Sequence, residues 1–501
     1  MILGERSLAS CLHLCRNRAT VGAFSYGEPA FTGTATTIPV RMVRKLIAST
    51  CALTLAACSL TPEYETPAME TPAHWRDSES AAADTISAVT ADWWRQYDSA
   101  ELAATIEEAL DRNNDLRAAL HHIEQSRASA KVAGAGLYPA VDASGNATRR
   151  YIDTGTERED TSFSAQLSVA YEVDLWRRNQ AALDAALSRV DATVFDRDAL
   201  GLVVMSDTAR SWLQVVNLRE RQQIARANLD NGREVLAIVE ARFREGAASA
   251  LEVSQQRTAV ANAEAALAAL VRQERIAEDS LAVLRGLAPV ASTVTAQTLQ
   301  DLTLPAVAAG QPSALLGRRP DIRRAESDLI AANADIGVAR AAFYPQVQLG
   351  IDTALTASPG AAAAALIASI FQPVFQGGAL EGQLEGTRAR QAELAENYRT
   401  TVLTSFQEVE DALASVRAAR ERVALFDVAA EAARQAYQIS RERYVAGAID
   451  FLSLLDTQRS LLLAEDNFAQ ARFDQFTASV DLFKALGGGW EPERAPATPP
   501  M

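Results

Sequence analysis

Side chains able to do acid–base, nucleophilic or metal chemistry are scarce in this sequence. Beyond residue 57 there are one cysteine, Cys58, and three histidines, His74, His121 and His122. His121 and His122 are adjacent, so on a helix they point to different faces and form no metal-binding pair. Acidic residues are abundant, but nothing in their spacing singles out a general acid. The sequence therefore predicts no enzyme, no metal site and no cofactor other than a covalent lipid.

The lipid prediction comes from a targeting signal that ends at Cys58. A positively charged segment at residues 42–45 precedes an apolar run over residues 46–57, too short to span a membrane, as in a secretory signal peptide. Residues 55–58, Leu-Ala-Ala-Cys, resemble the bacterial lipobox, whose cysteine is lipidated and becomes the first mature residue. By the same resemblance, Ser59 directs the protein to the outer membrane. The alternative is an ordinary signal with an incidental cysteine.

The charge of the mature chain excludes one class of partner. Residues 1–57 hold six basic and two acidic side chains, so the remainder has 42 Lys or Arg against 61 Asp or Glu, a net charge of −19. Nucleic-acid binding needs clustered cations, so we expect no nucleic-acid partner.

One pattern occurs twice, over residues 317–350 and, more weakly, over residues 115–145. In each, apolar or small residues three and four apart indicate one face of a helix. After a Tyr-Pro pair the period drops to two, as in a strand with one apolar and one polar face. The chain is therefore predicted to be a duplication in which each half runs from helix into strand.

Four strands are expected. Strict alternation over residues 163–175 is the clearest signal; it pairs with a strand over residues 141–148 through a polar loop at residues 149–161. The second half offers residues 346–354 and a weaker, Ala-rich segment at residues 364–375. Closed membrane barrels begin at about eight strands, so several chains must share one barrel; three chains would provide twelve strands.

Two regions without proline, residues 176–288 and 374–491, are predicted to be helical hairpins. A similar sequence segment interrupts the predicted helix near the middle of each region, at Gly246 and at Gly447, which are 201 residues apart. Glycine commonly ends a helix because it adopts the left-handed conformation. The first helix, of about 69 residues, would extend roughly 100 Å, enough to cross a periplasmic space.

Taken together, these segments resemble the outer-membrane efflux lipoproteins of resistance-nodulation-division (RND) tripartite pumps, within the TolC superfamily. The resemblance covers essentially the whole chain from residue 58. The matching segments are residues 55–58, 93–94, 114–117, 171–176, 318–322, 341–345 and 373–378.

The resemblance implies a mainly α protein with a small β part. Its homotrimer would join a shared 12-stranded outer-membrane β-barrel to an α-barrel of long helices reaching into the periplasm. Small molecules would pass through it without chemical change, from a periplasmic adaptor and an inner-membrane RND pump to the exterior. Alternatives are a TolC-like duct for metal-ion efflux or type I secretion, and a periplasmic adaptor or scaffold, which would show one helical hairpin rather than two.

The family pattern places a gate at the turn of the second helical hairpin. Residues that form the constriction match Tyr444, Asp456 and Arg459, and the last two are neighbours on a helix surface. Some relatives have another acidic residue where this chain has Ser453. At the 201-residue offset the first copy has Phe243, Gln255 and Thr258, so polar gating groups occur in one copy only. We expect one hairpin to move while the other serves as frame.

Arg242 and Arg443 each lie four residues before the glycine of their turn, Gly246 or Gly447. Either they cap the carbonyls of the turn or they contact the adaptor, and the two roles are compatible.

The predicted organisation assigns Trp93 and Trp94 to the core of the folded part rather than to a membrane anchor. The Pro-, Thr- and Ser-rich segment before them is predicted to be an extended tether. The expected parts are an upstream extension at 1–41, a signal peptide at 42–57, the lipidated cysteine and tether at 58–90, a first repeat at 91–290, a connector at 291–313, a second repeat at 314–487 and a flexible tail at 488–501.

Overall fold

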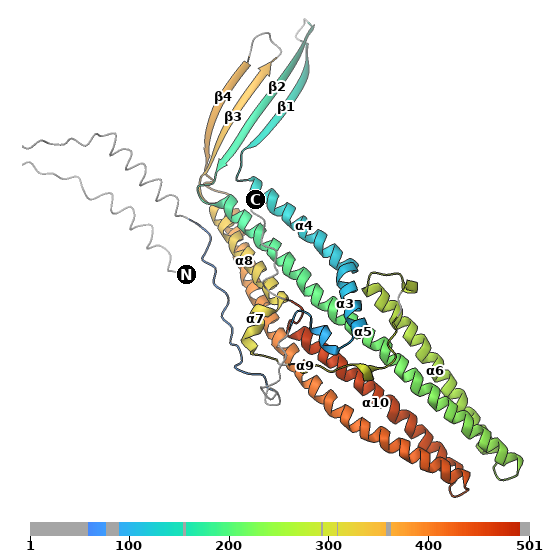
Figure 1. The fold of residues 1–501 in the computed structure, drawn as a ribbon. Helices are drawn as coiled ribbons and strands as arrows, with labels where there is room; N and C mark the ends of the chain where they lie inside the picture. Colours follow the sequence, from blue (N-terminus) through green and yellow to red (C-terminus); the bar gives the residue numbers. More distant parts are fainter. Residues whose placement is uncertain are drawn as a thin grey trace, which may run out of the picture. The chain divides into compact units, whose positions relative to one another are not determined.

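The computed structural model describes residues 59–76, 90–153, 157–291, 294–307, 309–356 and 362–490. These residues form long helices and one four-stranded antiparallel sheet (Figure 1), so the predicted mainly α fold with a small β part is confirmed. The predicted signal peptide and Cys58 lie outside the described residues. Among the described helices, none has the length and apolar content needed to cross a membrane.

The duplication is visible in the lengths of corresponding helices. Helices α4 and α8 have 22 residues each, α5 and α9 have 67 each, and α6 and α10 have 35 each. Helices α5 and α6 form one hairpin, and α9 and α10 form the other (Figure 1). The helix bounds are α3 Ala100–Arg112, α4 Asn114–Ala135, α5 Arg178–Arg244, α6 Ala250–Leu284, α7 Leu315–Arg318, α8 Pro320–Ala341, α9 Ala379–Val445 and α10 Phe451–Ala485.

The strands are β1 Ala140–Asp153, β2 Glu157–Val173, β3 Gln346–Thr356 and β4 Ala362–Phe371, in the order β1-β2-β3-β4. The four-strand prediction is confirmed, but the predicted loop at residues 149–161 is wrong. The ladder between β1 and β2 continues through Arg149↔Thr161 to Asp153↔Glu157. Backbone pairing extends the hairpin here although the side chains no longer alternate between apolar and polar.

The sheet is incomplete within one chain. Strands β1 and β4 each pair with a single neighbour, so both edges of the sheet are open. Large apolar side chains on it remain exposed, including Phe163 at 57%, Leu355 at 61% and Leu366 at 82%. An open edge beside exposed apolar side chains favours pairing with further strands.

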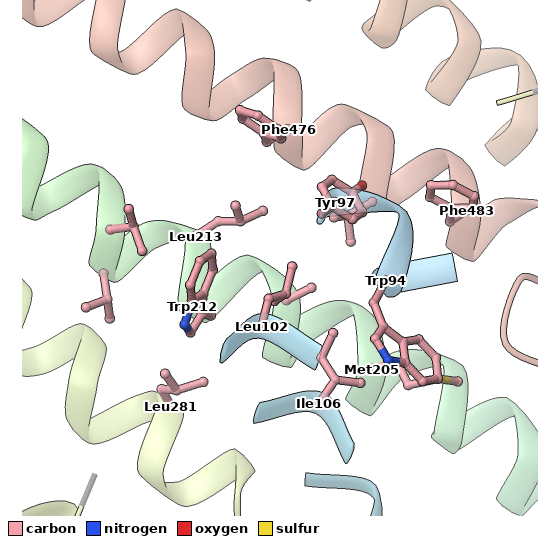
Figure 2. Close-up of a cluster of buried hydrophobic side chains, with 14 of the residues drawn as sticks. Trp94, Tyr97, Leu102, Ile106, Met205, Trp212, Leu213, Leu281, Phe476 and Phe483 are labelled. Carbon is pink, nitrogen blue, oxygen red and sulfur yellow. The ribbon is translucent and has the colours of Figure 1, made fainter. Parts of the chain in front are cut away.

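Aromatic residues near the start of the folded part join the two copies (Figure 2). Trp93 and Trp94 are 1% and 7% exposed, which confirms that they pack in the core. The Trp93 ring stacks on Phe483 of α10 with ring centroids 4.9 Å apart. The Tyr97 hydroxyl lies 2.5 Å from the Ser479 hydroxyl on the same helix. Trp212 of α5 belongs to the same cluster, so the cluster holds the first hairpin against the second.

Each copy is closed by a side-chain bond from the start of one helix to the end of another. Asn113, the N-cap of α4, donates from Nδ2 to the carbonyl of Leu284, the last residue of α6, over 2.9 Å. Arg319, the N-cap of α8, donates from Nη1 to the carbonyl of Ala485, the last residue of α10, over 3.0 Å. These bonds satisfy carbonyls that a helix C-terminus leaves free.

Glycine allows the backbone to pass close beside both of these bonds. Gly286 and Gly487 have φ values of +67° and +73°. A Cβ at Gly286 would lie 2.4 Å from the carbonyl oxygen of Arg112, and one at Gly487 would lie 2.6 Å from that of Arg318. Both positions therefore require glycine, for conformation and for space.

Residues 59–76, which we call the strap, are extended as predicted for a tether, but they pack against α8 and α9. Asn333 donates from Nδ2 to the carbonyl of Pro62 over 2.8 Å, and a Cβ at Gly337 would lie 2.1 Å from Oγ1 of Thr61. Trp75 is 1% exposed and contacts Phe406 edge to face. Composition alone missed this packing because one buried tryptophan and backbone hydrogen bonds are enough to hold a polar segment in place.

The start of the expected tail is also packed. Trp490 donates from Nε1 to Oδ2 of Asp198 over 3.0 Å and contacts Phe195 edge to face. The first residues of the tail predicted at 488–501 are therefore part of the packed structure, and residues 491–501 lie outside the described part of the chain.

Candidate functional site

The turns of the two helical hairpins have the same backbone structure. Gly246 and Gly447 both have φ of +74°. In each turn the residue after the glycine donates its N–H to the carbonyl of the arginine four residues before the glycine, over 2.8 Å in both cases. This is the left-handed helix ending predicted at both glycines, and the structure confirms it. We call residues 242–252 the first tip and residues 443–453 the second tip.

The returning helices begin with side-chain caps. Ser249 accepts from the N–H of Glu252, whose carboxylate reaches back to Ser249 in a capping box. Asp450 accepts from the N–H of Ser453 over 2.7 Å, and hydrogen bonds from Ser453 lower the pKa of Asp450. Ser453 thus lies in the first turn of α10.

The two tips contact each other through Arg242 and Tyr444. The Arg242 guanidinium lies over the Tyr444 ring, 4.7 Å from Cζ to the ring centroid. Its Nη1 also donates to the Tyr444 carbonyl over 2.5 Å. Arg242 was predicted to cap carbonyls of its own turn, but its side chain instead caps a carbonyl at the helix end of the other copy.

Tyr444 is almost fully buried between the tips, at 2% exposed. Its hydroxyl donates to Oε2 of Glu252 over 3.3 Å, and its ring contacts Phe451 edge to face. Burial, together with the negative charge of Glu252, raises the pKa of the Tyr444 hydroxyl. Of the three predicted gate residues, Tyr444 is thus the one that links the first hairpin to the second.

Asp456 and Arg459 are exposed on α10, within two turns of the second tip. Within the described part of the chain, neither side chain makes a hydrogen bond or an ion pair, and they make none with each other. Arg443 is likewise exposed and has no such partner among the described residues. The structure therefore groups these cations and this carboxylate near the tips but leaves them unpaired within one chain.

Polar contacts farther along the hairpins also hold α5 against the second copy. Arg221 makes a bidentate ion pair with Asp466 of α10, at 2.7 Å and 3.0 Å. Nearer the tip, Arg441 of α9 lies 2.6 Å from Glu234 of α5. No local sequence pattern predicts these pairs, because the partners are more than 200 residues apart.

A largely buried arginine fixes the connector between the repeats. Arg219 of α5 donates to Glu274 over 2.6 Å and to Glu278 over 2.7 Å, and both acceptors lie on α6. Its Nη1 donates to the carbonyls of Val294 and Ala296 in the connector, the latter over 3.1 Å. This side chain was not among the predicted residues, because no local pattern marks it.

The sequence model of the family described as "Outer membrane efflux protein" matches residues 105–287 and 311–488. The chain is 39% identical to the pyoverdine export outer membrane protein OpmQ of Pseudomonas aeruginosa, over 89% of this chain and 97% of that protein. It is 33% identical to the outer membrane protein OprJ of Pseudomonas aeruginosa, over 89% and 95% of the two chains.

Solved structures show the same fold. The outer-membrane channel OprN matches with a TM-score of 0.79 and 30% identity, covering 86% of this chain and all of that one. The Campylobacter jejuni CmeC outer membrane channel matches with a TM-score of 0.82 at 24% identity, covering 87% and 96%. With its duplicated helical hairpins and four-stranded sheet, this chain belongs to the outer membrane efflux protein family and is an outer-membrane component of an efflux system.

Proposed function

We propose that this protein is the exit duct of a tripartite efflux system and works as a homotrimer. The observation that carries the proposal is the four-stranded sheet, which has two open edges and exposed apolar side chains, attached to two pairs of long helices. Three copies would supply twelve strands, enough to close a membrane barrel. The helical hairpins of the three chains would continue the wall of the duct into the periplasm.

In this proposal the partners are a periplasmic adaptor and an inner-membrane RND pump, which supply the cargo and the energy. Relatives are named for export of pyoverdine, toluene and antibiotics. Such different cargoes on one architecture support a duct that conducts small molecules passively and does not select them. Transport needs no bond to be made or broken, so the residues of this chain act by lining and closing a path.

A lipid on Cys58 would reach the same membrane as the sheet. The strap runs antiparallel to α8, with the Leu60 carbonyl accepting from Arg340 near the end of that helix, just before β3 begins at Gln346. Cys58 is two residues before Leu60. The strap thus supports a lipid anchor beside the sheet, added to the anchoring by the strands themselves.

Reconstitution of the full lipidated protein tests the duct. The purified protein in mild detergent should have the mass of three chains by native mass spectrometry, and it should conduct ions when inserted into a planar lipid bilayer. A monomeric mass together with silent bilayers contradicts the proposal. A trimer that inserts into the bilayer but conducts no ions would support the assembly and contradict the duct.

The gate prediction rests on Asp456 and Arg459, whose charges are unpaired within one chain. In a closed trimer they are expected to bond to neighbouring helices or subunits around the axis. A narrow constriction contains little water, so the attraction between opposite charges is stronger there. Replacing both with alanine should therefore increase single-channel conductance in the planar bilayer. The matched control is the double alanine variant at Gln255 and Thr258, the corresponding positions of the first copy. Equal conductance of the gate variant and the unaltered protein would remove the assignment.

A further inference from the structure

The two tips are equivalent in backbone but not in their contacts. The first tip has Arg242 followed by Phe243, and the second has Arg443 followed by Tyr444, at the constant offset of 201 residues. Both pairs precede a glycine with the same φ and the same backbone hydrogen bonds. The side chains of the two tips therefore leave the helix ends in corresponding directions.

Within one chain, only one of two possible contacts of this kind is made. Arg242 of the first tip covers Tyr444 of the second, and Tyr444 is 2% exposed. The corresponding ring of the first tip, Phe243, is 47% exposed. Arg443, the counterpart of Arg242, is exposed and makes no hydrogen bond or ion pair with the described residues. One cation and one aromatic ring are thus left over, in the arrangement that the other pair uses.

A closed ring of chains supplies the missing contact. Around such a ring, the first hairpin of one chain is followed by its second hairpin, and this is followed by the first hairpin of the next chain. The junction between chains therefore repeats, with the copies exchanged, the junction within a chain. We propose that Arg443 of each subunit lies over Phe243 of the next subunit and donates to its carbonyl, as Arg242 does to Tyr444. This proposal rests on the homotrimeric duct proposed above.

The chemistry of the two groups fits this contact. A guanidinium is attracted to the face of an aromatic ring, and a cation is favourable at the negative end of a helix. The Phe243 carbonyl already accepts the N–H of Gly246 over 3.0 Å, and the Tyr444 carbonyl accepts that of Gly447 over 3.0 Å as well as the Arg242 bond. A carbonyl oxygen has two lone pairs, so the first bond leaves room for the arginine.

The contact between chains would have fewer bonds than the contact within a chain. Tyr444 adds a hydroxyl bond to Glu252, whereas Phe243 has no hydroxyl, and Ser453 stands at the position that corresponds to Glu252. Of the polar bonds that join the tips within a chain, only the bond made by the arginine therefore has a counterpart between subunits. This makes Arg443 a residue for subunit–subunit contact, in addition to any contact it makes with an adaptor.

Cysteine cross-linking tests the contact directly. Residues 59–501 contain no cysteine, so the double variant Phe243→Cys with Arg443→Cys has its only engineered thiols at the two positions. Both side chains are exposed, so the substitutions should not disturb folding. A flexible bis-maleimide of about the length of an arginine side chain should convert the monomer band into covalent trimer on a denaturing gel. Mass spectrometry should identify the link between positions 243 and 443.

Matched variants define the other outcomes. Either single cysteine variant can give at most a covalent dimer, and the pair Arg242→Cys with Tyr444→Cys should link within one chain without an increase in mass. If native mass spectrometry shows a trimer but the pair at 243 and 443 gives no link between chains, the contact is wrong and the duct stands. If native mass spectrometry shows only monomers, the trimeric duct fails and this contact fails with it.

Discussion

An Arg219→Ala chain is expected to lose about 3 kcal/mol of unfolding free energy, because truncation leaves two largely buried carboxylates without their partner. The side chains of Glu274 and Glu278 are only 16% and 18% exposed, and Arg219 is 14% exposed. The variant also loses the bonds that hold the connector carbonyls of Val294 and Ala296. Urea unfolding of the detergent-solubilised protein, followed by helical circular dichroism, measures the loss.

Arg233→Ala is the matched control on the same helix. Arg233 pairs with Glu264 of α6 over 2.7 Å, but the side chains are 55% and 50% exposed. Exposed pairs of this kind contribute less than about 1 kcal/mol, so this variant should unfold close to the unaltered protein. Equal losses in the two variants would show that burial of the Arg219 cluster contributes nothing.

The pH dependence of stability in the Arg219→Ala variant provides a second measurement. Burial alone would raise the pKa of Glu274, but hydrogen bonds from Arg219 and Gln222 lower it overall. A carboxylate whose pKa is lowered by folding stabilises the fold above its unfolded pKa, and this stabilisation is lost as pH falls through the folded pKa. Without Arg219 the pKa of Glu274 is lowered less, because only Gln222 and the charge of Arg275 still oppose its burial, so the variant has less of this stabilisation to lose in acid. The difference in unfolding free energy between the unaltered protein and Arg219→Ala should therefore become smaller as the pH falls.

The helix ends and the strands could be predicted from local features of the sequence, because local backbone and side-chain preferences determine them. A helix must end where Gly246 and Gly447 adopt a left-handed conformation, so the turns could be placed to the residue. Alternation locates a strand only while one of its faces is apolar. The continuation of β1 and β2 through residues 149–161 depends on backbone pairing, which leaves no mark on side-chain pattern.

The contacts at the tips and in the core were less accessible from sequence. Arg242 was predicted to cap carbonyls, yet its acceptor, Tyr444, lies 202 residues away in the other copy. Arg219 and Glu274 are 55 residues apart, and each looks like any other charge on a solvated helix. Such pairs are set by how the hairpins pack, which no spacing within one helix encodes. The duplication is the signal that remains, because a side chain found in one copy directs attention to its counterpart.

Comparing corresponding positions of the two copies leads to Arg319, where a second large loss of stability is expected. Its guanidinium, 10% exposed, donates to the carbonyl of Ala485 and pairs with Asp321 and Glu408, so it joins α8, α9 and α10. Arg319→Ala should cost about 2 kcal/mol of unfolding free energy, as for the loss of a hydrogen bond to a charged group, because the two carboxylates left behind are partly exposed and can be solvated. The same urea titration measures it.

Two variants separate the causes of this loss. Arg318→Ala removes an adjacent exposed arginine that makes no hydrogen bond or ion pair with the described residues, so it should change stability by less than about 0.5 kcal/mol. Asn113→Ala removes the neutral counterpart in the first copy, whose bonds reach Leu284 and the start of α4, and should cost about 1 kcal/mol, as for other helix caps. If Arg319→Ala costs no more than Asn113→Ala, its carboxylates contribute nothing and only the helix-to-helix bond matters. The expected losses of unfolding free energy decrease from Arg319→Ala to Asn113→Ala to Arg318→Ala. This order would show that the charge of Arg319 adds stability that the neutral Asn113 does not provide in the first copy.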